Sequence, residues 1–327
     1  MKGTAPGRIL NRSIVKHIPA YGAGRACAGR DYSILEEDNG SGQAVVLAEG
    51  YSVDSVVAYL RAANNLATSG AAADKITVNI VAGKDTPENV FRSEMLKLTD
   101  YARSKNIRII GGNTVYSGQG SEAAFTVTAY GKTPAETLKK LTRMPEECDK
   151  LVIFGNVGEY GASVIAAEKR EELKKRFPES YMECYNFPAE KLDITHAAKC
   201  LIEAGAVMLH DISFGGVFRA LHDIAEYSGL GLEILHENVP IKQSTIELTE
   251  YFNINPYMLL GTGGLIAVVK PDLPENVLEE IEQKTKTPCR MAGRLTKERQ
   301  VTITSEVYQM RRSIGLYEED EIYKVLK

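Results

Sequence analysis

The stretch that decides the fold runs from His210 to Ile234 and reads His210-Asp-Ile-Ser-Phe-Gly-Gly-Val-Phe-Arg-Ala-Leu-His-Asp-Ile-Ala-Glu-Tyr-Ser-Gly-Leu-Gly-Leu-Glu-Ile234. The apolar run 206–209 precedes it and is typical of a short buried strand. Gly215-Gly216 then begin a predicted helix, in which apolar side chains recur at helical spacing on one face: Val217, Phe218, Leu221, Ile224 and Ala225. Gly229 and Gly231 end this helix, and residues 232–235 return to a strand pattern. The stretch therefore predicts a strand, a polar corner, a helix and a second strand.

The polar corner offers two kinds of candidate site residue. Gly215 and Gly216 at a helix start leave backbone N–H groups that can hold an anion such as a phosphate, although a glycine pair also allows a helix to pack closely. His210 and Asp211 at the strand exit can orient a phosphate or transfer a proton, or they can merely cap and pack there. On the other side of the helix we expect His222 to be solvated.

Length and composition describe a soluble two-domain enzyme. The chain has 327 residues, 25% of them charged and 44% hydrophobic. A net charge of −4 without a Lys/Arg block argues against a nucleic-acid partner. No apolar signal region or membrane-length run is present, so we expect a cytoplasmic protein. The five cysteines are widely spaced without Cys-x-x-Cys, which favours neither a disulfide framework nor a structural zinc site.

Strand and helix patterns alternate through the first half, which predicts an α/β layered domain. The predicted strands cover residues 43–48, 75–83, 107–110 and 124–130. One helix is predicted after a cap at Ser52 or Asp54, and a second from Thr86-Pro87 to about Lys105. The Gly- and Ala-rich residues 1–30 are not expected to form a regular element. Their composition leaves open a disordered lead-in or a loop that closes over a ligand.

A polar connector, residues 132–150, is the predicted domain boundary. We therefore expect domains at 1–140 and 148–310 and a C-terminal tail at 311–327. The strands predicted in the second half are 151–154, 206–209, 232–235, 265–269, 291–296 and 301–304, and the helices are one from Gly161 to about Arg176, 195–204, 215–229 and one after Pro274. Residues 177–192 are predicted to be a loop, and the last twenty or so a short surface helix.

The opening stretch resembles the C-terminal domain of the aminoimidazole ribonucleotide (AIR) synthetase superfamily, and within it most closely the hydrogenase maturation factors. Seven further segments resemble motifs of that superfamily in the same order along the chain: Gly29–Ser33, Val46–Tyr51, Ala63–Ala71, Ile109–Thr114, Gly155–Ala162, Asn255–Leu265 and Ala292–Thr296. The second matches the strand ending Thr-Asp-Gly and the fourth the Gly-Gly-Asp-Thr turn. Each match is weak alone, but their order covers nearly the whole chain.

The resemblance implies a PurM-like architecture of class α/β (α+β). It implies an N-terminal sheet domain that forms a homodimer interface, a C-terminal α/β domain, and ATP bound in the cleft between them. Magnesium would bridge the phosphates to acidic side chains of the first domain, since hard oxygen ligands on Mg²⁺ neutralise a triphosphate.

The chain departs from the superfamily where that magnesium would bind. Asn65 and Asn113 stand where the motifs have aspartates, while Glu49 matches the aspartate of Thr-Asp-Gly and Asp31 remains of a Gly-Asp-Asp pair. Asparagine offers a neutral oxygen without the charge, so magnesium binding should be weaker. No cysteine lies in the last residues, so we do not expect carbamoyl dehydration on a C-terminal thiol.

Two hypotheses follow. The first is an ATP-binding, hydrogenase-maturation-factor-like enzyme that activates a small molecule or a protein group by phosphoryl transfer. Its metal ligands would be Asp31 and Glu49 and its catalytic residues His210 and Asp211. The other nucleotide-binding residues would be Asn65, Gly111, Gly112, Asn113, Thr114, Gly215 and Gly216. The second is a catalytically silent homodimer that binds a ligand or partner without turning over ATP.

Overall fold

The computed structural model describes residues 7–19, 27–38, 40–117, 120–316 and 319–326. These form two compact units: an N-terminal unit, residues 31–141, and a C-terminal unit, residue 142 onward together with residues 7–19 and 27–30. Of the Gly- and Ala-rich residues 1–30 considered above as a lid or lead-in, 1–6 and 20–26 lie outside the described residues. The expectation that this segment has no regular element was wrong for Gly7–Ser13, which form a helix, and for Val15–His17, which form a 3-10 turn.

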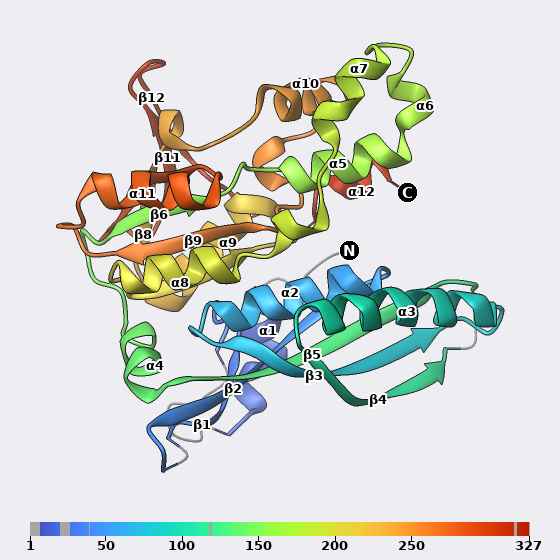
Figure 1. The fold of residues 1–327 in the computed structure, drawn as a ribbon. Helices are drawn as coiled ribbons and strands as arrows, with labels where there is room; N and C mark the ends of the chain where they lie inside the picture. Colours follow the sequence, from blue (N-terminus) through green and yellow to red (C-terminus); the bar gives the residue numbers. More distant parts are fainter. Residues whose placement is uncertain (1–6, 20–26, 39, 118–119, 317–318, 327) are drawn as a thin grey trace. The chain divides into compact units, whose positions relative to one another are not determined.

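The N-terminal unit is a five-stranded sheet with two long helices on one face (Figure 1). Its strands lie in the order β1-β2-β5-β3-β4, and all neighbours are antiparallel except β3 and β4. The elements are β1 (Ser33–Glu36), β2 (Gln43–Ser52), α2 (Ser55–Ala67), β3 (Ala72–Ala82), α3 (Glu88–Ser104), β4 (Arg108–Tyr116), β5 (Ala123–Pro134) and α4 (Ala135–Leu141).

Alternation along β2 shows how the sheet is covered on one side. Ala44, Val46 and Ala48 are buried, whereas Glu49 and Tyr51 are exposed. Because successive strand residues point to opposite faces, the buried set faces α2 and the exposed set lies on the face that α2 and α3 do not cover. We call this second side the open face.

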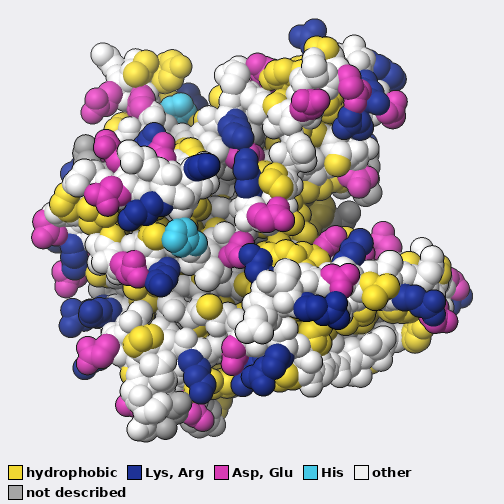
Figure 2. Space-filling model, in the orientation of Figure 1, with side chains coloured by type: hydrophobic (Ala, Val, Ile, Leu, Met, Phe, Trp, Pro, Cys, Tyr) yellow, Lys and Arg dark blue, Asp and Glu magenta, His cyan; other side chains and the backbone are white. Residues whose placement is uncertain are grey.

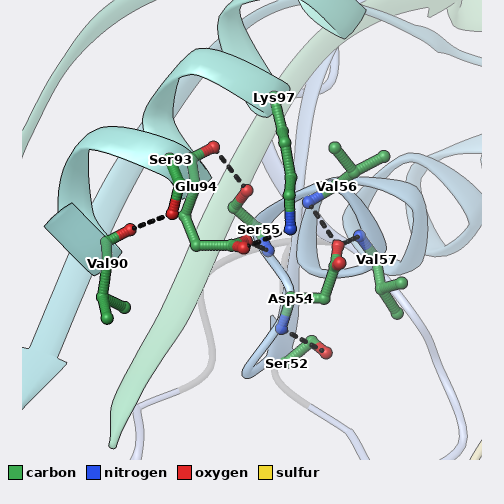
Figure 3. Close-up of polar contacts among 9 residues, drawn as sticks. All are labelled: Ser52, Asp54, Ser55, Val56, Val57, Val90, Ser93, Glu94 and Lys97. Atoms are coloured by element: carbon green, nitrogen blue, oxygen red, sulfur yellow. Dashed lines mark hydrogen bonds and ion pairs between the residues drawn. The ribbon is translucent and has the colours of Figure 1, made fainter.

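Asp54 caps α2, one of the two residues predicted to do so (Figure 3). Its carboxylate accepts hydrogen bonds from the N–H groups of Val56 (2.9 Å) and Val57 (3.0 Å). Glu94 of α3 accepts from the Ser55 N–H at 2.9 Å, and the Ser55 hydroxyl donates to the Glu94 carbonyl at 2.8 Å. The start of α2 is therefore satisfied by its own cap and held to the neighbouring helix.

Two predictions for this unit were wrong. The strand predicted at 107–110 continues to Tyr116 as β4, so that residues 111–114 lie in a strand rather than a turn, because pairing with β3 continues to Ala82. The predicted connector at 132–150 begins inside β5, which pairs with β2 up to Pro134, and continues as helix α4.

The C-terminal unit contains a seven-stranded sheet in the order β12-β11-β8-β10-β6-β9-β7. Its strands are β6 (Lys150–Phe154), β7 (Met208–Ile212), β8 (Gly231–Leu235), β9 (Gly264–Val269), β10 (Cys289–Thr296), β11 (Val301–Ser305) and β12 (Met310–Ser313). Its α-helices are α1 (Gly7–Ser13), α5 (Glu159–Glu168), α6 (Arg170–Leu173), α7 (Glu179–Met182), α8 (Thr195–Glu203), α9 (Gly216–Ser228), α10 (Gln243–Tyr251), α11 (Glu275–Thr285) and α12 (Ile322–Val325).

The predicted order of strand, helix and strand is confirmed as β7, α9 and β8. The first strand was misplaced by two to three residues: β7 covers Met208–Ile212, so His210 and Asp211 lie inside the strand, paired with β9, and not in a polar corner after it. Val217, Leu221 and Ile224 of α9 are buried in one core cluster with sheet residues such as Ile153 and Ile266. Gly229 ends α9 in the left-handed region at φ 69°, and its N–H closes the last turn on the Ala225 carbonyl.

Other predictions for this unit were only partly right. The helix predicted up to Arg176 divides at Lys169 into α5 and α6, and residues 177–192 contain α7 and two short 3-10 helices rather than a plain loop. The end of the chain is not a surface helix. Strand β12 extends the sheet, and Ile322 of the short helix α12 is buried.

Lys and Arg side chains are interspersed with Asp and Glu over the face drawn in Figure 2. No helix within the described residues is long and apolar enough to cross a membrane.

Candidate functional site

The two predicted metal ligands of the N-terminal unit come from neighbouring segments. Glu49 is exposed on the open face of β2, and its carboxylate accepts a hydrogen bond from the Thr128 hydroxyl at 3.4 Å. Strand β1 pairs with β2 so that Ser33 stands opposite Leu47. Asp31 lies two residues before β1, outside the paired residues; if the antiparallel register continued to it, Asp31 would stand opposite Glu49, with Cα atoms roughly 5 Å apart. Two carboxylates at this spacing fit a hard cation such as Mg²⁺.

Asn65 lies next to this pair. Its side-chain nitrogen donates a hydrogen bond to the backbone carbonyl of Glu49 at 2.9 Å. The amide therefore tethers α2 to β2, which an aspartate could not do because an ionised carboxylate only accepts. An asparagine at this position has a structural use beside any contact with a ligand.

Residues 111–114 lie at the opposite side of the sheet. In the paired registers Glu49 stands beside Thr128, Thr128 beside Thr77 and Thr77 beside Gly111. Three inter-strand steps separate Glu49 from Gly111, or about 14 Å at roughly 4.8 Å per step. Asn113 lies in β4, two residues after Gly111. Within one chain, a single ion held by Glu49 therefore cannot also contact Asn113.

The two glycines of β4 have different surroundings. A Cβ at Gly112, where φ is 157°, would lie 1.8 Å from the Val78 carbonyl oxygen, whereas one at Gly111 would meet no atom within 4 Å. Gly112 is therefore required for the pairing of β3 and β4. Asn113 accepts a hydrogen bond from the N–H of Thr114 at 2.9 Å.

In the C-terminal unit, His210 and Asp211 are buried, with 6% and 5% of their surface exposed. His210 Nε2 lies 3.7 Å from Asp223 Oδ2, and Arg219 Nε donates a hydrogen bond to Asp223 Oδ1 at 2.9 Å. Burial raises the pKa of Asp223, but His210 and Arg219 outweigh that effect and hold this pKa below its usual range. A buried charge cluster thus surrounds His210, and its predicted catalytic role stays a prediction.

The helix start at Gly215-Gly216 binds an anion that belongs to the chain itself. The Gly215 N–H donates to Asp320 at 2.7 Å, and the Gly216 N–H donates to the Ser213 carbonyl at 3.2 Å. Asp320 is 3% exposed. The N–H groups predicted to hold a phosphate are therefore engaged within the C-terminal unit.

Sequence reasoning missed two features. His222, predicted to be solvated, is half-buried and hydrogen-bonded through Nε2 to the Ile314 carbonyl at 3.0 Å, and burial lowers its pKa. A cavity of about 250 Å³ beside the loop after β6 is lined by Lys191, Lys242 and Lys286. These lysines come from separate segments, so no spacing in the sequence indicates that they meet.

No cluster of three or more His, Cys, Asp or Glu side chains that could hold a metal ion is found in the part of the chain that the structure describes. Any divalent ion at Asp31 and Glu49 would need further ligands from water, amides or phosphate oxygens.

Residues 147–306 match the family of the AIR synthase related protein, C-terminal domain. Among curated proteins, the carbamoyl dehydratase HypE of Bradyrhizobium diazoefficiens is 24% identical over 274 residues, which cover 79% of this chain and 75% of that protein. The hydrogenase expression/formation protein HupE of Azotobacter chroococcum is 19% identical over 67% of this chain and 62% of its own length.

Solved structures show the same fold. A chain of a HypE–HypF complex superposes with a TM-score of 0.75 at 20% identity and covers 95% of this chain and 100% of its own. HypE in complex with ATP gives a TM-score of 0.69 at 17% identity and covers 96% and 95%.

These findings define a two-domain, PurM-like α/β protein. Residues 147–306, just under half of the chain, match the AIR synthase related family, and the predicted resemblance of the chain to this superfamily and to its hydrogenase maturation factor branch is confirmed.

Proposed function

We propose that this chain is a HypE-like protein that binds ATP through its N-terminal unit. The observation that carries the proposal is the pairing of Ser33 with Leu47, from which Asp31 and Glu49 each lie two residues away toward the same end of the strand pair, in a fold shared with an ATP-bound HypE. Asp31 and Glu49 would hold Mg²⁺ on the phosphates, and bound MgATP would supply an activated phosphoryl group. The acceptor would be a small molecule or a protein group.

A second candidate is a silent relative that does not turn over ATP. Asn65 and Asn113 favour it because each replaces a charged ligand by a neutral one. The hydrogen bond from Asn65 to the Glu49 backbone adds weight, since that amide stabilises the local fold without any metal.

Calorimetric titration with ATP, with and without Mg²⁺, tests the first proposal. Magnesium-dependent binding supports it. Absence of binding by a folded protein contradicts it and leaves the silent relative.

Restoring the aspartates separates the two candidates. We expect Asn65→Asp with Asn113→Asp to strengthen MgATP binding if the metal site is a weakened version of the superfamily site. Asn79→Asp is the matched control, because Asn79 pairs with Asn113 in register and is exposed on the same face. Equal gains from both substitutions would show a general charge effect and not a metal site. MgATP binding that appears only in the restored double variant would identify the natural chain as the silent form.

We further propose that the open face forms a homodimer interface. Tyr51, Val81 and Val115 are 52%, 46% and 44% exposed on β2, β3 and β4, and Val81 pairs with Val115 in register. An exposed apolar patch of this kind is typical of protein-protein contacts. Val81→Lys should give monomers in light scattering coupled to size exclusion, whereas Leu96→Lys on α3, where Leu96 is 58% exposed, should not. A wild-type monomer at micromolar concentration would refute the proposal.

A further inference from the structure

The cavity of about 250 Å³ lies entirely within the C-terminal unit, between the loop after β6 and the start of β9. Its walls include the side chains of Glu159, Tyr160, Lys191, Lys242 and Lys286. The volume equals that of about eight water molecules at roughly 30 Å³ each. The cavity can therefore hold a small organic molecule.

Positive charge dominates this cavity. Three lysines face a single acid, Glu159, among the lining residues. Lys242 Nζ lies 2.6 Å from Glu159 Oε1, and Lys191 Nζ lies 3.9 Å from the same oxygen. The side-chain nitrogen of Asn156 donates to Glu159 Oε2 at 2.8 Å. One carboxylate balances one of the three ammonium groups, and the cavity keeps a net charge of +2.

Lys286 differs from the other two lysines. It follows α11 in the left-handed region at φ 55°, and no carboxylate lies within 4 Å of its ammonium in the described parts of the chain. Lys284, two residues earlier, lies 3.9 Å from Glu280 and does not line the cavity. Lys286 therefore supplies a cation at the cavity that no neighbouring acid neutralises.

One wall of the cavity is aromatic. The rings of Tyr160 and Phe187 have centroids 5.6 Å apart, and Lys191 Nζ lies 5.7 Å from the centroid of the Phe187 ring. Aromatic surface next to cationic groups suits a ligand that has a flat apolar part and an anionic end.

A glycine allows two backbone segments beside the cavity to approach each other closely. Gly263 has φ 96°, and a Cβ there would lie 2.9 Å from the Lys191 carbonyl oxygen. The segment that carries Lys191 can thus approach the start of β9 closely only because residue 263 has no side chain.

We propose that this cavity binds a small aromatic anion, with its phosphate or carboxylate group on Lys286 and Lys242 and its flat part against Tyr160 and Phe187. The proposal does not rest on ATP binding. Its probes contain no nucleotide, so it can fail while the proposed function holds, and the reverse.

Calorimetric titration of the full chain with phenyl phosphate, benzoate and neutral benzyl alcohol tests the proposal. We expect one or both anions to bind at millimolar concentration or better and the alcohol not to bind. Comparison of phenyl phosphate with benzoate shows which anionic group the site prefers. Lys286→Gln should weaken anion binding about tenfold, since it removes a hydrogen bond from a charged donor.

Three further variants test whether positive charge at the cavity is responsible for anion binding. Lys284→Gln removes the same charge two residues earlier, inside α11, and should leave binding unchanged. Lys286→Arg keeps the charge and should retain most of the affinity. Glu159→Gln should strengthen anion binding several-fold, because Glu159 is the one acid among the described residues that line the cavity.

The proposal is overturned if neither anion binds to the folded wild-type protein, if Lys286→Gln and Lys284→Gln bind equally well, or if Glu159→Gln weakens binding. If Glu159→Gln does not fold, as judged by circular dichroism, the comparison of the two position-286 variants with Lys284→Gln decides alone.

Discussion

Asp320 fastens the end of the chain to the C-terminal unit. Its carboxylate accepts hydrogen bonds from the N–H groups of Gly215 at 2.7 Å, Leu260 at 3.2 Å and Ile322 at 2.9 Å. The side chain is 3% exposed, so water cannot readily replace it. Asp320→Ala would leave these donors without their acceptor.

The magnitude follows from which donors stay buried. The N–H of Ile322 can reach water if the chain end detaches, but those of Gly215 and Leu260 remain inside the unit. At about 1–3 kcal/mol for each of these two unsatisfied buried groups, Asp320→Ala should lower the free energy of unfolding by about 2–6 kcal/mol. Asp320→Asn keeps one acceptor oxygen and the shape, so we expect a loss of about 2 kcal/mol.

Hydrogen exchange with mass spectrometry is the decisive assay, because two units need not unfold together and a single urea transition can mix them. Peptides that contain Gly215 and Leu260 should exchange faster in Asp320→Ala, while peptides of the N-terminal unit should not change. Asp272→Asn is the control, since Asp272 is exposed. Unchanged exchange at both peptides, together with a wild-type urea midpoint, would show that Asp320 does not anchor this segment.

Two more predictions concern the N-terminal unit. Gly112→Ala should lower the free energy of unfolding by about 2–4 kcal/mol, because its Cβ would push β4 away from the Val78 carbonyl. Gly111→Ala, the control, should lower it by less than about 1 kcal/mol. Urea unfolding followed by circular dichroism compares the two variants, and equal losses would contradict the contact between residue 112 and Val78. Partial burial raises the pKa of Glu94, but the hydrogen bonds from Lys97 and Ser55 lower it more, so the folded-state pKa lies below the ordinary 4.5. This contribution is complete above the unfolded-state pKa and is lost as the pH falls through the folded-state pKa. Glu94→Gln should therefore destabilise the protein at pH 7 and matter less below about pH 4; a difference from wild type that is constant with pH would refute this.

Much of the fold could be predicted because local physics determines it. The glycines that bound α9, the apolar spacing within it and the cap at Asp54 all act over a few residues, and they placed these elements within one or two positions. Predictions failed where distant contacts decide the structure. Residues 177–192 have no clear period, and their short helices are supported by ring contacts such as Phe177 with Tyr181 and with Tyr251 of α10.

The candidate site shows the same contrast between features that neighbouring residues determine and features that depend on distant contacts. The sequence correctly indicates that the N–H groups at Gly215 attract an anion, because a helix start carries partial positive charge whatever surrounds it. It cannot indicate that the anion is a carboxylate 105 residues later, since that contact depends on how β12 and the residues after it return to the unit. Lys191, Lys242 and Lys286 are likewise ordinary surface lysines in the sequence and become a cationic cavity only through the tertiary fold. A motif at a helix start therefore predicts the kind of ligand it attracts, whereas the identity of that ligand depends on chain segments that the motif does not contain.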